Sequence, residues 1–376
     1  MKHRRYWFGG LAAVALATAV WMAVGTAGAA PKRHSSTKLT KVTLQLKWVT
    51  QAQFAGYYAA KAKGYYKQAG LDVNIKVGGP DITPETVVAG GQAEFGIDWL
   101  PSLLAIRDGG SAKLVNIAQV FTRSGMTELT WKDSGIDTVA KMRNKKVGNW
   151  LGGNQYELFA ALVRSGMDPN KNKGVTIVKQ PFDMGLFLNR QIDAASAMTY
   201  NELAQVLENK NPKTGKLTKL SELNVIKMEG IGTGMLEDGV FTTESWINDP
   251  SHQAIAKKFL AASFKGWIYC RDHSQDCVKF VLAKGPTLLK GHQTWQMNEI
   301  NALIWPAPKG IGIMDAKAFA RTAKIAKQFG VIKKSPSGAY RTDLARAAVA
   351  SLKAQHVDVN GRKWKKIKVA VTPGGK

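Results

Sequence analysis

Apolar and polar residues alternate from residue 42 onward, as they do in a half-buried strand. Val42, Leu44 and Leu46 fall on one side of this predicted strand, which extends to Trp48. Apolar residues then recur at helical spacing between residues 51 and 63. The same succession repeats, so the pattern predicts further strands at 71–75, 94–97 and 114–121, and helices from 83 and over 101–108.

A second series of the same kind begins near Ile136. It predicts strands at 145–150, 175–179, 194–199 and 224–228, helices at 156–165, 184–190 and 202–209, and a hydrophilic connector at 210–219. Alternating strands and helices imply sheets that are mainly parallel and are covered by helices on both faces. We therefore predict an α/β protein with two lobes.

Beyond residue 250 the pattern is mainly helical, with helices predicted at 252–269, 275–283, 314–329 and 342–355. The chain has two cysteines, Cys270 and Cys277. On one continuous helix, seven residues rise about 10.5 Å, whereas bridged cysteines have Cα atoms about 4.4–6.8 Å apart. A disulfide therefore requires the helix to break between them. Asp272 and Ser274 are suitable caps for a second helix, and we favour the bond.

The N-terminus has the features of a secretory signal peptide. A basic start, residues 1–5, precedes an apolar run over 8–24, and Ala27 and Ala29 suit signal peptidase. We therefore predict a signal peptide at residues 1–30, a polar tether at 31–40, and an exported protein. A retained anchor stays open as an alternative, although a bilayer span usually needs about 20 apolar residues.

The net charge of +26 is large for a chain of 376 residues. Such an excess can attract nucleic acid, anionic membranes or acidic ligands. Basic residues are scattered along the chain, and the dense cluster at 362–368 is interpreted as a solvated tail. Export makes nucleic acid an unsuitable partner. We therefore expect the positive charge to be an adaptation of the solvent-exposed surface. Weak attraction to anionic lipid remains an alternative role for it.

In open sheets of this kind, ligands bind at the carboxyl ends of the strands. Aromatic, amide and carboxylate side chains recur at these positions in both predicted lobes. They are Trp48, Gln51, Phe54, Asp98, Trp99 and Gln119 in the first series, and Trp150, Gly152, Gly153, Asn154, Tyr156, Glu157, Phe182, Asp183, Tyr200, Asn201 and Glu202 in the second. Flat rings offer stacking faces, and the polar groups offer directed hydrogen bonds. The combination predicts a site for a planar, polar heterocycle.

Each of these residues also has an ordinary structural explanation. A tryptophan at a strand end can pack between lobes, and Asp98 or Asp183 can cap a helix. Glu157 gains from the helix dipole whether or not a ligand is bound. The prediction depends on their coincidence at one edge of each sheet.

Sequence motifs for catalysis are absent: the chain contains no GxSxG, HExxH or Walker A pattern. The histidines that follow the tether fall in the helical C-terminal part, away from the predicted cleft. They are His252, His273, His292 and His356. We therefore expect a binding protein that is not an enzyme and that needs no cofactor and no metal.

Several stretches resemble a known family: Leu-Gln-Leu-Lys-Trp at 44–48, Gln-Phe-Ala-Gly-Tyr-Tyr at 53–58, Gly-Tyr-Tyr to Gly-Leu-Asp-Val at 64–73, and Glu-Asp-Gly at 237–239. Over residues 41–335 the chain resembles the periplasmic binding proteins related to thiamine-pyrimidine synthase. That family includes receptors for riboflavin and for thiamine pyrimidine precursors. The matched stretch at 237–239 adds Asp238 to the predicted ligand-binding residues.

The resemblance implies a two-lobed periplasmic binding protein of type II with a hinge between its lobes. The chain would cross the hinge near 125–135 and 225–235. Lobe 1 would comprise 41–130 and 230–376, and lobe 2 would comprise 131–229. Such a monomer closes on a small heteroaromatic ligand and presents it to an ABC permease and its ATPase.

The ligand is narrowed further by a departure from the family's pattern. Pyrimidine receptors usually carry Asp-Trp-x-Pro-Asn after the first strand, whereas this chain has Lys-Trp-Val-Thr-Gln at 47–51. Residues 50–58, Glu157 and the stretch 200–202 are more similar to riboflavin receptors, so we favour a flavin over an aminopyrimidine. The synthase reaction is disfavoured because no histidine occurs between His34 and His252 and no cysteine-rich motif is present.

Overall fold

Two five-stranded sheets organise residues 38–374, the part of the chain that this computed structural model describes. The predicted signal peptide lies outside the described residues, as does most of the predicted tether. No helix within residues 38–374 is long and apolar enough to cross a membrane.

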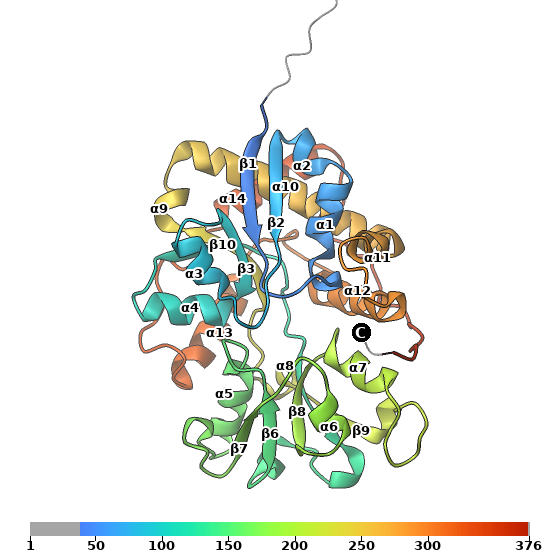
Figure 1. Cartoon of the computed structure of the whole chain (residues 1–376). Helices are drawn as coiled ribbons and strands as arrows, with labels where there is room; N and C mark the ends of the chain where they lie inside the picture. The colour runs from blue at the N-terminus through green and yellow to red at the C-terminus, as the bar shows by residue number, and fades with distance from the viewer. Residues whose placement is uncertain (1–37, 375–376) are drawn as a thin grey trace, which may run out of the picture. The chain divides into compact units, whose positions relative to one another are not determined.

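The first sheet has the strand order β2-β1-β3-β10-β4 and defines lobe 1 (Figure 1). Its strands are β1 (Thr40–Gln45), β2 (Leu71–Lys76), β3 (Phe95–Trp99), β4 (Leu114–Gln119) and β10 (Asp238–Thr243). β1 pairs with β2 and β3 in parallel, whereas β10 lies antiparallel between β3 and β4. The return of the chain at β10 therefore completes the centre of this sheet.

The second sheet has the order β7-β6-β8-β5-β9 and defines lobe 2. Its strands are β5 (Met126–Trp131), β6 (Lys146–Asn149), β7 (Thr176–Lys179), β8 (Ala194–Met198) and β9 (Leu223–Lys227). β6 pairs in parallel with β7 and β8, while β5 is antiparallel to β8 and β9. Both sheets thus combine parallel pairs with one reversed strand.

The reversed strands β5 and β10 follow the two passages of the chain between the sheets. The chain leaves lobe 1 after β4 through residues 120–125 and returns after β9 through residues 228–237. The first crossing was expected at 125–135, but most of that range forms β5. That placement is wrong because all six residues of β5 are buried and hydrogen-bonded within the sheet.

Helices cover both sheets, and most of the predicted helices are present. Their bounds are α1 (Ala55–Ala62), α2 (Tyr65–Gln68), α3 (Pro84–Ala89), α4 (Leu100–Asp108), α5 (Tyr156–Arg164), α6 (Gly185–Leu188), α7 (Glu202–Glu208), α8 (Met228–Ile231), α9 (Glu244–Ile247), α10 (Pro250–Asp272), α11 (Ser274–Leu282), α12 (Lys290–Ile304), α13 (Ala316–Gln328) and α14 (Asp343–Ala354). α10 packs against α1 and α14 in lobe 1. The sequence pattern did not predict α12.

A disulfide joins Cys270 to Cys277, with the two Cα atoms 5.4 Å apart. This separation is attained because α10 ends at Asp272 and α11 begins at Ser274. The residue at the break is His273, which serves as the N-cap of α11 in place of the expected Asp272 or Ser274. Both cysteines are fully buried.

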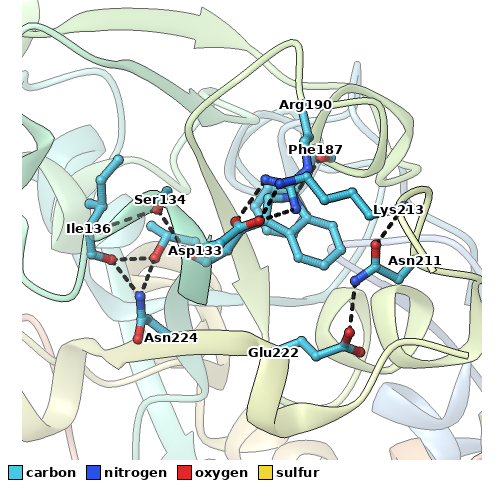
Figure 2. A network of polar contacts seen from close by, with 11 residues as sticks. Asp133, Ser134, Ile136, Phe187, Arg190, Asn211, Lys213, Glu222 and Asn224 are labelled. Carbon is cyan, nitrogen blue, oxygen red and sulfur yellow. Dashed lines mark hydrogen bonds and ion pairs between the residues drawn. The ribbon is translucent and has the colours of Figure 1, made fainter.

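The hydrophilic connector at 210–219 is held to lobe 2 by polar contacts (Figure 2). Lys213 Nζ lies 2.5 Å from Asp133 Oδ2, and Arg190 forms a bidentate pair with the same carboxylate at 2.9 and 3.1 Å. Hydrogen bonds from Arg190 and Lys213 lower the pKa of Asp133 to about 2. Asn211 donates a further hydrogen bond to Glu222 at 2.9 Å.

Candidate functional site

Two adjoining cavities lie between the strand ends of lobe 1 and those of lobe 2. The larger has a volume of about 760 Å³, and residues 79–85 of lobe 1 and 150–156 of lobe 2 contribute to its walls. The smaller lies beside Trp99 and Tyr200. The two cavities share four residues, which makes them parts of one cleft. These are Lys47, Trp48, Trp150 and Asn154.

Aromatic rings from both lobes face the cleft. Trp48 of lobe 1 packs edge to face against Phe182 of lobe 2, with ring centroids 5.0 Å apart. Trp99 and Trp150 line it from opposite lobes, and Tyr200 lines the smaller cavity. Trp99 is the last residue of β3, and the other rings lie in the short loops after β1, β6, β7 and β8, so the strand ends bring these rings together. Such rings can stack on a flat ligand.

Amide side chains form a continuous hydrogen-bonded row across the floor of the smaller cavity. Gln296 Nε2 donates to Gln51 Oε1 at 2.9 Å, and Gln51 donates in turn to Gln53 at 2.6 Å. Gln53 donates to Asp238, which also accepts from Trp99 Nε1 at 3.0 Å. This row fixes the orientation of the Trp99 ring.

Asp238 lies behind this ring and is almost fully buried. Burial raises the pKa of Asp238 to about 7, against the hydrogen bond from Gln53 and the attraction of Lys47, which lower it. Through its hydrogen bonds with Gln53 and Trp99, the carboxyl group of Asp238 holds two residues of the cavity wall in place.

One end of the cleft is closed by a contact between α12 of lobe 1 and α7 of lobe 2. His292 Nε2 lies 2.9 Å from Asn201 Oδ1, and Gln296 donates to the same oxygen at 2.9 Å. His292 Nδ1 lies 2.8 Å from Glu208 Oε2. The expectation that all four C-terminal histidines lie away from the cleft is wrong for His292, because it contacts Asn201, a residue of the cavity wall.

A buried charged cluster occupies the lobe 1 wall. Lys47 forms an ion pair with Asp98, and its Nζ lies 5.0 Å from the centre of the Trp99 ring. Burial alone would lower the pKa of Lys47, but the attraction of Asp98, Glu85 and Asp238 outweighs it and raises the pKa. Burial, together with the negative charge of Asp98, raises the pKa of Glu85 well above its usual range.

The turn before α5 forms part of the lobe 2 wall. Gly153 has a φ of +100°, and a Cβ atom there would lie 2.5 Å from Ser102 Oγ of lobe 1. Ser102 donates a hydrogen bond to the carbonyl of Gly153 at 3.3 Å. Glycine is therefore required where the two lobes approach each other.

The structure brings most of the predicted ligand-binding residues to the cleft. Those that line it are Trp48, Gln51, Asp98, Trp99, Trp150, Gly152, Gly153, Asn154, Tyr156, Phe182, Tyr200, Asn201 and Glu202. They come from both lobes, and their role towards a ligand stays a prediction.

The remaining predicted residues line neither cavity. Phe54 is fully buried in the core, and Gln119 donates to the carbonyls of Phe121 and Glu237. Asp183 is exposed and accepts a hydrogen bond from the backbone of Gly185 at the start of α6. Asp238 lies behind Trp99.

Glu157, the last of these residues, lies at the passage between the lobes. Its carboxylate accepts hydrogen bonds from Ser124 Oγ at 2.7 Å and from the backbone of Met235 at 2.8 Å. Glu157 lies in the first turn of α5, as the sequence predicted, and its contacts also tie α5 to both crossing segments.

Sequence reasoning did not select several residues of the cleft wall: Lys47, Gln53, Glu85, Ser102 and Met198. Lys47 precedes Trp48 and Gln53 precedes Phe54, so their position beside predicted site residues could have identified them as residues of the cleft. Glu85 follows Thr83-Pro84, the predicted start of a helix. A carboxylate in the first turn of a helix is explained by the helix dipole alone, so nothing in the sequence selected Glu85 for the cleft.

Comparison with known proteins gives a family and a fold. The family model described as "NMT1/THI5 like" matches residues 51–277, and this match confirms the resemblance found in the sequence. Riboflavin-binding protein RibY of Chloroflexus aurantiacus is 23% identical over 316 residues, covering 81% of this chain and 85% of that protein.

Solved structures share the fold. A protein of Bordetella bronchiseptica RB50 has a TM-score of 0.64 at 14% identity, covering 84% of this chain and 99% of its own. The alkanesulfonate-binding protein SsuA of Xanthomonas axonopodis pv. citri, solved with MOPS, has a TM-score of 0.58 at 15% identity, covering 82% and 98%. The predicted two-lobed α/β binding-protein fold is thereby confirmed.

Proposed function

The chain belongs to the NMT1/THI5-like family, and we propose that it is the extracytoplasmic substrate-binding component of an ABC importer. It captures a planar heteroaromatic vitamin or precursor, riboflavin in preference to an aminopyrimidine, between its two lobes. It then delivers this ligand to a membrane permease and its ATPase. The protein itself carries out no chemical reaction.

The observation that carries the proposal is the set of aromatic rings that both lobes contribute to one cleft. Trp48 and Trp99 come from lobe 1, and Trp150 and Tyr200 come from lobe 2. A ligand held between them would contact both lobes at once, so binding would favour the closed arrangement. The similarity to a riboflavin-binding protein supports the flavin over other flat ligands.

Riboflavin fluorescence provides the test. We expect the purified protein to quench the fluorescence of riboflavin on binding, because a stacked flavin loses its emission to the indole rings. Trp48→Ala should weaken this binding at least about tenfold, since it removes a stacking face worth about 0.5–1.5 kcal/mol together with buried apolar area.

Trp364→Ala is the matched control, since this half-buried tryptophan lines neither cavity. Equal losses in the two variants would contradict the role of Trp48. If riboflavin fluorescence is not quenched but calorimetry shows that an aminopyrimidine binds, the ligand is the aminopyrimidine and not the flavin. Release of a chemically altered ligand would contradict the binding-protein class altogether.

A further inference from the structure

We infer that lobe 1 carries a second binding surface, a basic groove that docks on the anionic lipid head groups of a bilayer. The groove lies between α2, α10 and α14, has a volume of about 450 Å³ and shares no residue with the cleft. Figure 1 shows α2 and α10 at the end of lobe 1 that lies away from lobe 2. The inference therefore does not depend on the ligand of the cleft.

The groove combines a basic and polar rim with a floor of small apolar side chains. The exposed or partly exposed polar residues around it are Gln68, Lys257, Lys258, Lys265, Ser351 and Gln355. Ala262, Ala348 and Leu352 are buried beneath them. The phosphate of a lipid head group would meet the lysines, and its glycerol carbons would meet the apolar floor.

Acidic residues are absent from the segments that form this face. Residues 51–71, which include α1 and α2, contain no aspartate or glutamate, and neither do residues 250–271 or 344–357, which hold most of α10 and α14. The basic residues of these segments are Lys61, Lys63, Lys67, Lys257, Lys258, Lys265, Arg271, Arg346 and Lys353. None of the residues that line the groove is acidic. The face is therefore uniformly positive.

The lysines of the groove have no carboxylate partner. Within residues 38–374, Lys257, Lys258 and Lys265 form no ion pair. Lys265 Nζ lies 4.8 Å from the centre of the Tyr65 ring, a contact that orients the side chain without removing its charge. All three ammonium groups can therefore meet an anion without breaking an existing ion pair.

Another basic helix, α13, shows how this face differs from the rest of the surface. Its exposed lysines are Lys317, Lys324 and Lys327. Carboxylates accompany them, because Asp315 at the N-cap pairs with Lys309 and Glu229 pairs with Arg321. An anionic bilayer attracts a uniformly positive face more strongly than a mixed one, since like charges repel it at short range. α13 therefore provides a matched control.

The point at which the chain enters lobe 1 favours a bilayer over an acidic protein as the occupant. Thr40 begins β1, and its amide donates to the carbonyl of Gly70 just after α2. The sequence ahead of β1 contains the apolar run at 8–24 and the basic pair Lys32-Arg33. Both features suit a membrane. The basic face thus lies where a membrane-directed segment joins the lobe.

Vesicle binding provides the test, with the exported protein and two lipid compositions. We expect the protein to sediment with vesicles of phosphatidylglycerol and phosphatidylcholine, and far less with phosphatidylcholine alone. The preference should vanish at about 1 M salt, where the screening length falls to about 3 Å. Equal binding to both vesicles, or a preference that salt does not change, would overturn the inference. Either result leaves the proposed function standing.

A triple variant locates the binding surface. Lys257→Gln, Lys258→Gln and Lys265→Gln together should weaken binding to the anionic vesicles at least about tenfold, because each lysine near such a surface contributes roughly fivefold. The control removes the same charge from α13, through Lys317→Gln, Lys324→Gln and Lys327→Gln. It should weaken binding less than about threefold. Equal losses would assign the binding to the net charge of the chain and overturn the groove.

A single substitution serves if the triple variant does not fold. Ala347→Glu places a carboxylate in the groove at an exposed position and should weaken vesicle binding about fivefold. Ala320→Glu, exposed on α13, is its control and should change binding little. Two further probes separate other anions from the bilayer. Binding of polyglutamate or of soluble glycerol phosphate, without a preference for anionic vesicles, would assign the groove to that anion and overturn the inference.

Discussion

His292 forms two hydrogen bonds that connect lobe 1 with lobe 2. One ring nitrogen contacts Glu208 and the other contacts Asn201. The amide nitrogen of Asn201 donates to Glu202 at 2.6 Å, so its oxygen faces the imidazole. His292 therefore joins α12 to both ends of α7, whose N-cap is Asn201 and whose last residue is Glu208.

Replacement of His292 by alanine should strongly destabilise the protein. The change leaves the buried side chains of Glu208 and Asn201 each without a hydrogen-bond partner, and each buried polar group left unpaired costs about 1–3 kcal/mol. Urea unfolding measures the effect. Glu208→Ala in the same chain should restore part of the lost free energy, because the buried carboxyl group that lost its partner is then gone. Strictly additive losses in the double variant would contradict the pairing.

The role of His292 could not be recognised from the sequence because its helix was not predicted. The buried face of α12 is largely polar and includes His292, Gln293, Gln296, Asn298 and Asn301. Helix prediction relies on apolar residues at helical spacing, and this helix buries amides that bond to side chains and backbone elsewhere. The strand-end tryptophans were selected correctly as cleft residues because topology alone brings strand ends to one edge.

At the scale of elements, α12 also organises the C-terminal segment, residues 361–374. Asn298 donates to the carbonyl of Ile367 at 2.8 Å and accepts from its amide at 3.1 Å. Lys366 forms an ion pair with Glu299, and the amide of Gly374 reaches the carbonyl of Glu208 in lobe 2. In Figure 1 this segment runs beside α12 to an end near α7. The basic side chains are exposed, as expected, but the backbone is anchored to both lobes.

Asn298→Ala should lower the free energy of unfolding by about 1–3 kcal/mol, because it leaves two backbone groups of Ile367 without their partner. Thr294→Ala on the same helix is the control. Thr294 is only partly buried and bonds within its own helix, to Lys290, so a loss within about 0.5 kcal/mol is expected. Chemical unfolding of the two variants makes the comparison. Similar losses would show that the segment is not anchored through Asn298.

The strands that escaped prediction have a common physical reason. β5 and β10 are buried on both faces but contain buried polar residues, including Thr127 and Glu128 in β5 and Asp238 in β10, so they show neither the alternation of β1 nor a continuous apolar run. β10 also begins with Asp238-Gly239, a pair typical of turns. Gly239 is needed in the strand because a Cβ there would lie 2.3 Å from the side chain of Asn116 on β4. Packing between strands distant in sequence thus overrides the local pattern.

At the scale of the whole molecule, two buried carboxyl groups join the segments that pass between the lobes. Glu157 of α5 accepts from Ser124 in the first passage and from Met235 in the second. Glu237, in the second passage, accepts from the amide of Gly125 at 2.5 Å. Burial raises the pKa of Glu157 to about 8. Burial, followed by repulsion from Glu157, raises the pKa of Glu237 well above its usual range.

These carboxyl groups make the stability of the whole protein depend on pH. The folded state holds protons that the unfolded state releases above about pH 4.5, so the protein binds more protons when folded and loses stability as pH rises. The contribution of Glu157 is complete below about pH 4.5 and is lost as pH rises through about 8. The melting temperature should therefore fall between about pH 5 and about pH 8.5.

Glu157→Gln keeps the shape of the side chain and removes its titration. We expect the variant to melt close to the parent protein at about pH 5 and above it at about pH 8.5, where the parent must ionise a buried carboxyl group. Thermal unfolding at the two pH values provides the comparison, with exposed Asp72→Asn as the control. Two outcomes would contradict the proposal that Glu157 holds a proton between the two lobes. The parent protein could become more stable towards pH 8.5, or the melting temperature of the variant could change with pH as steeply as that of the parent.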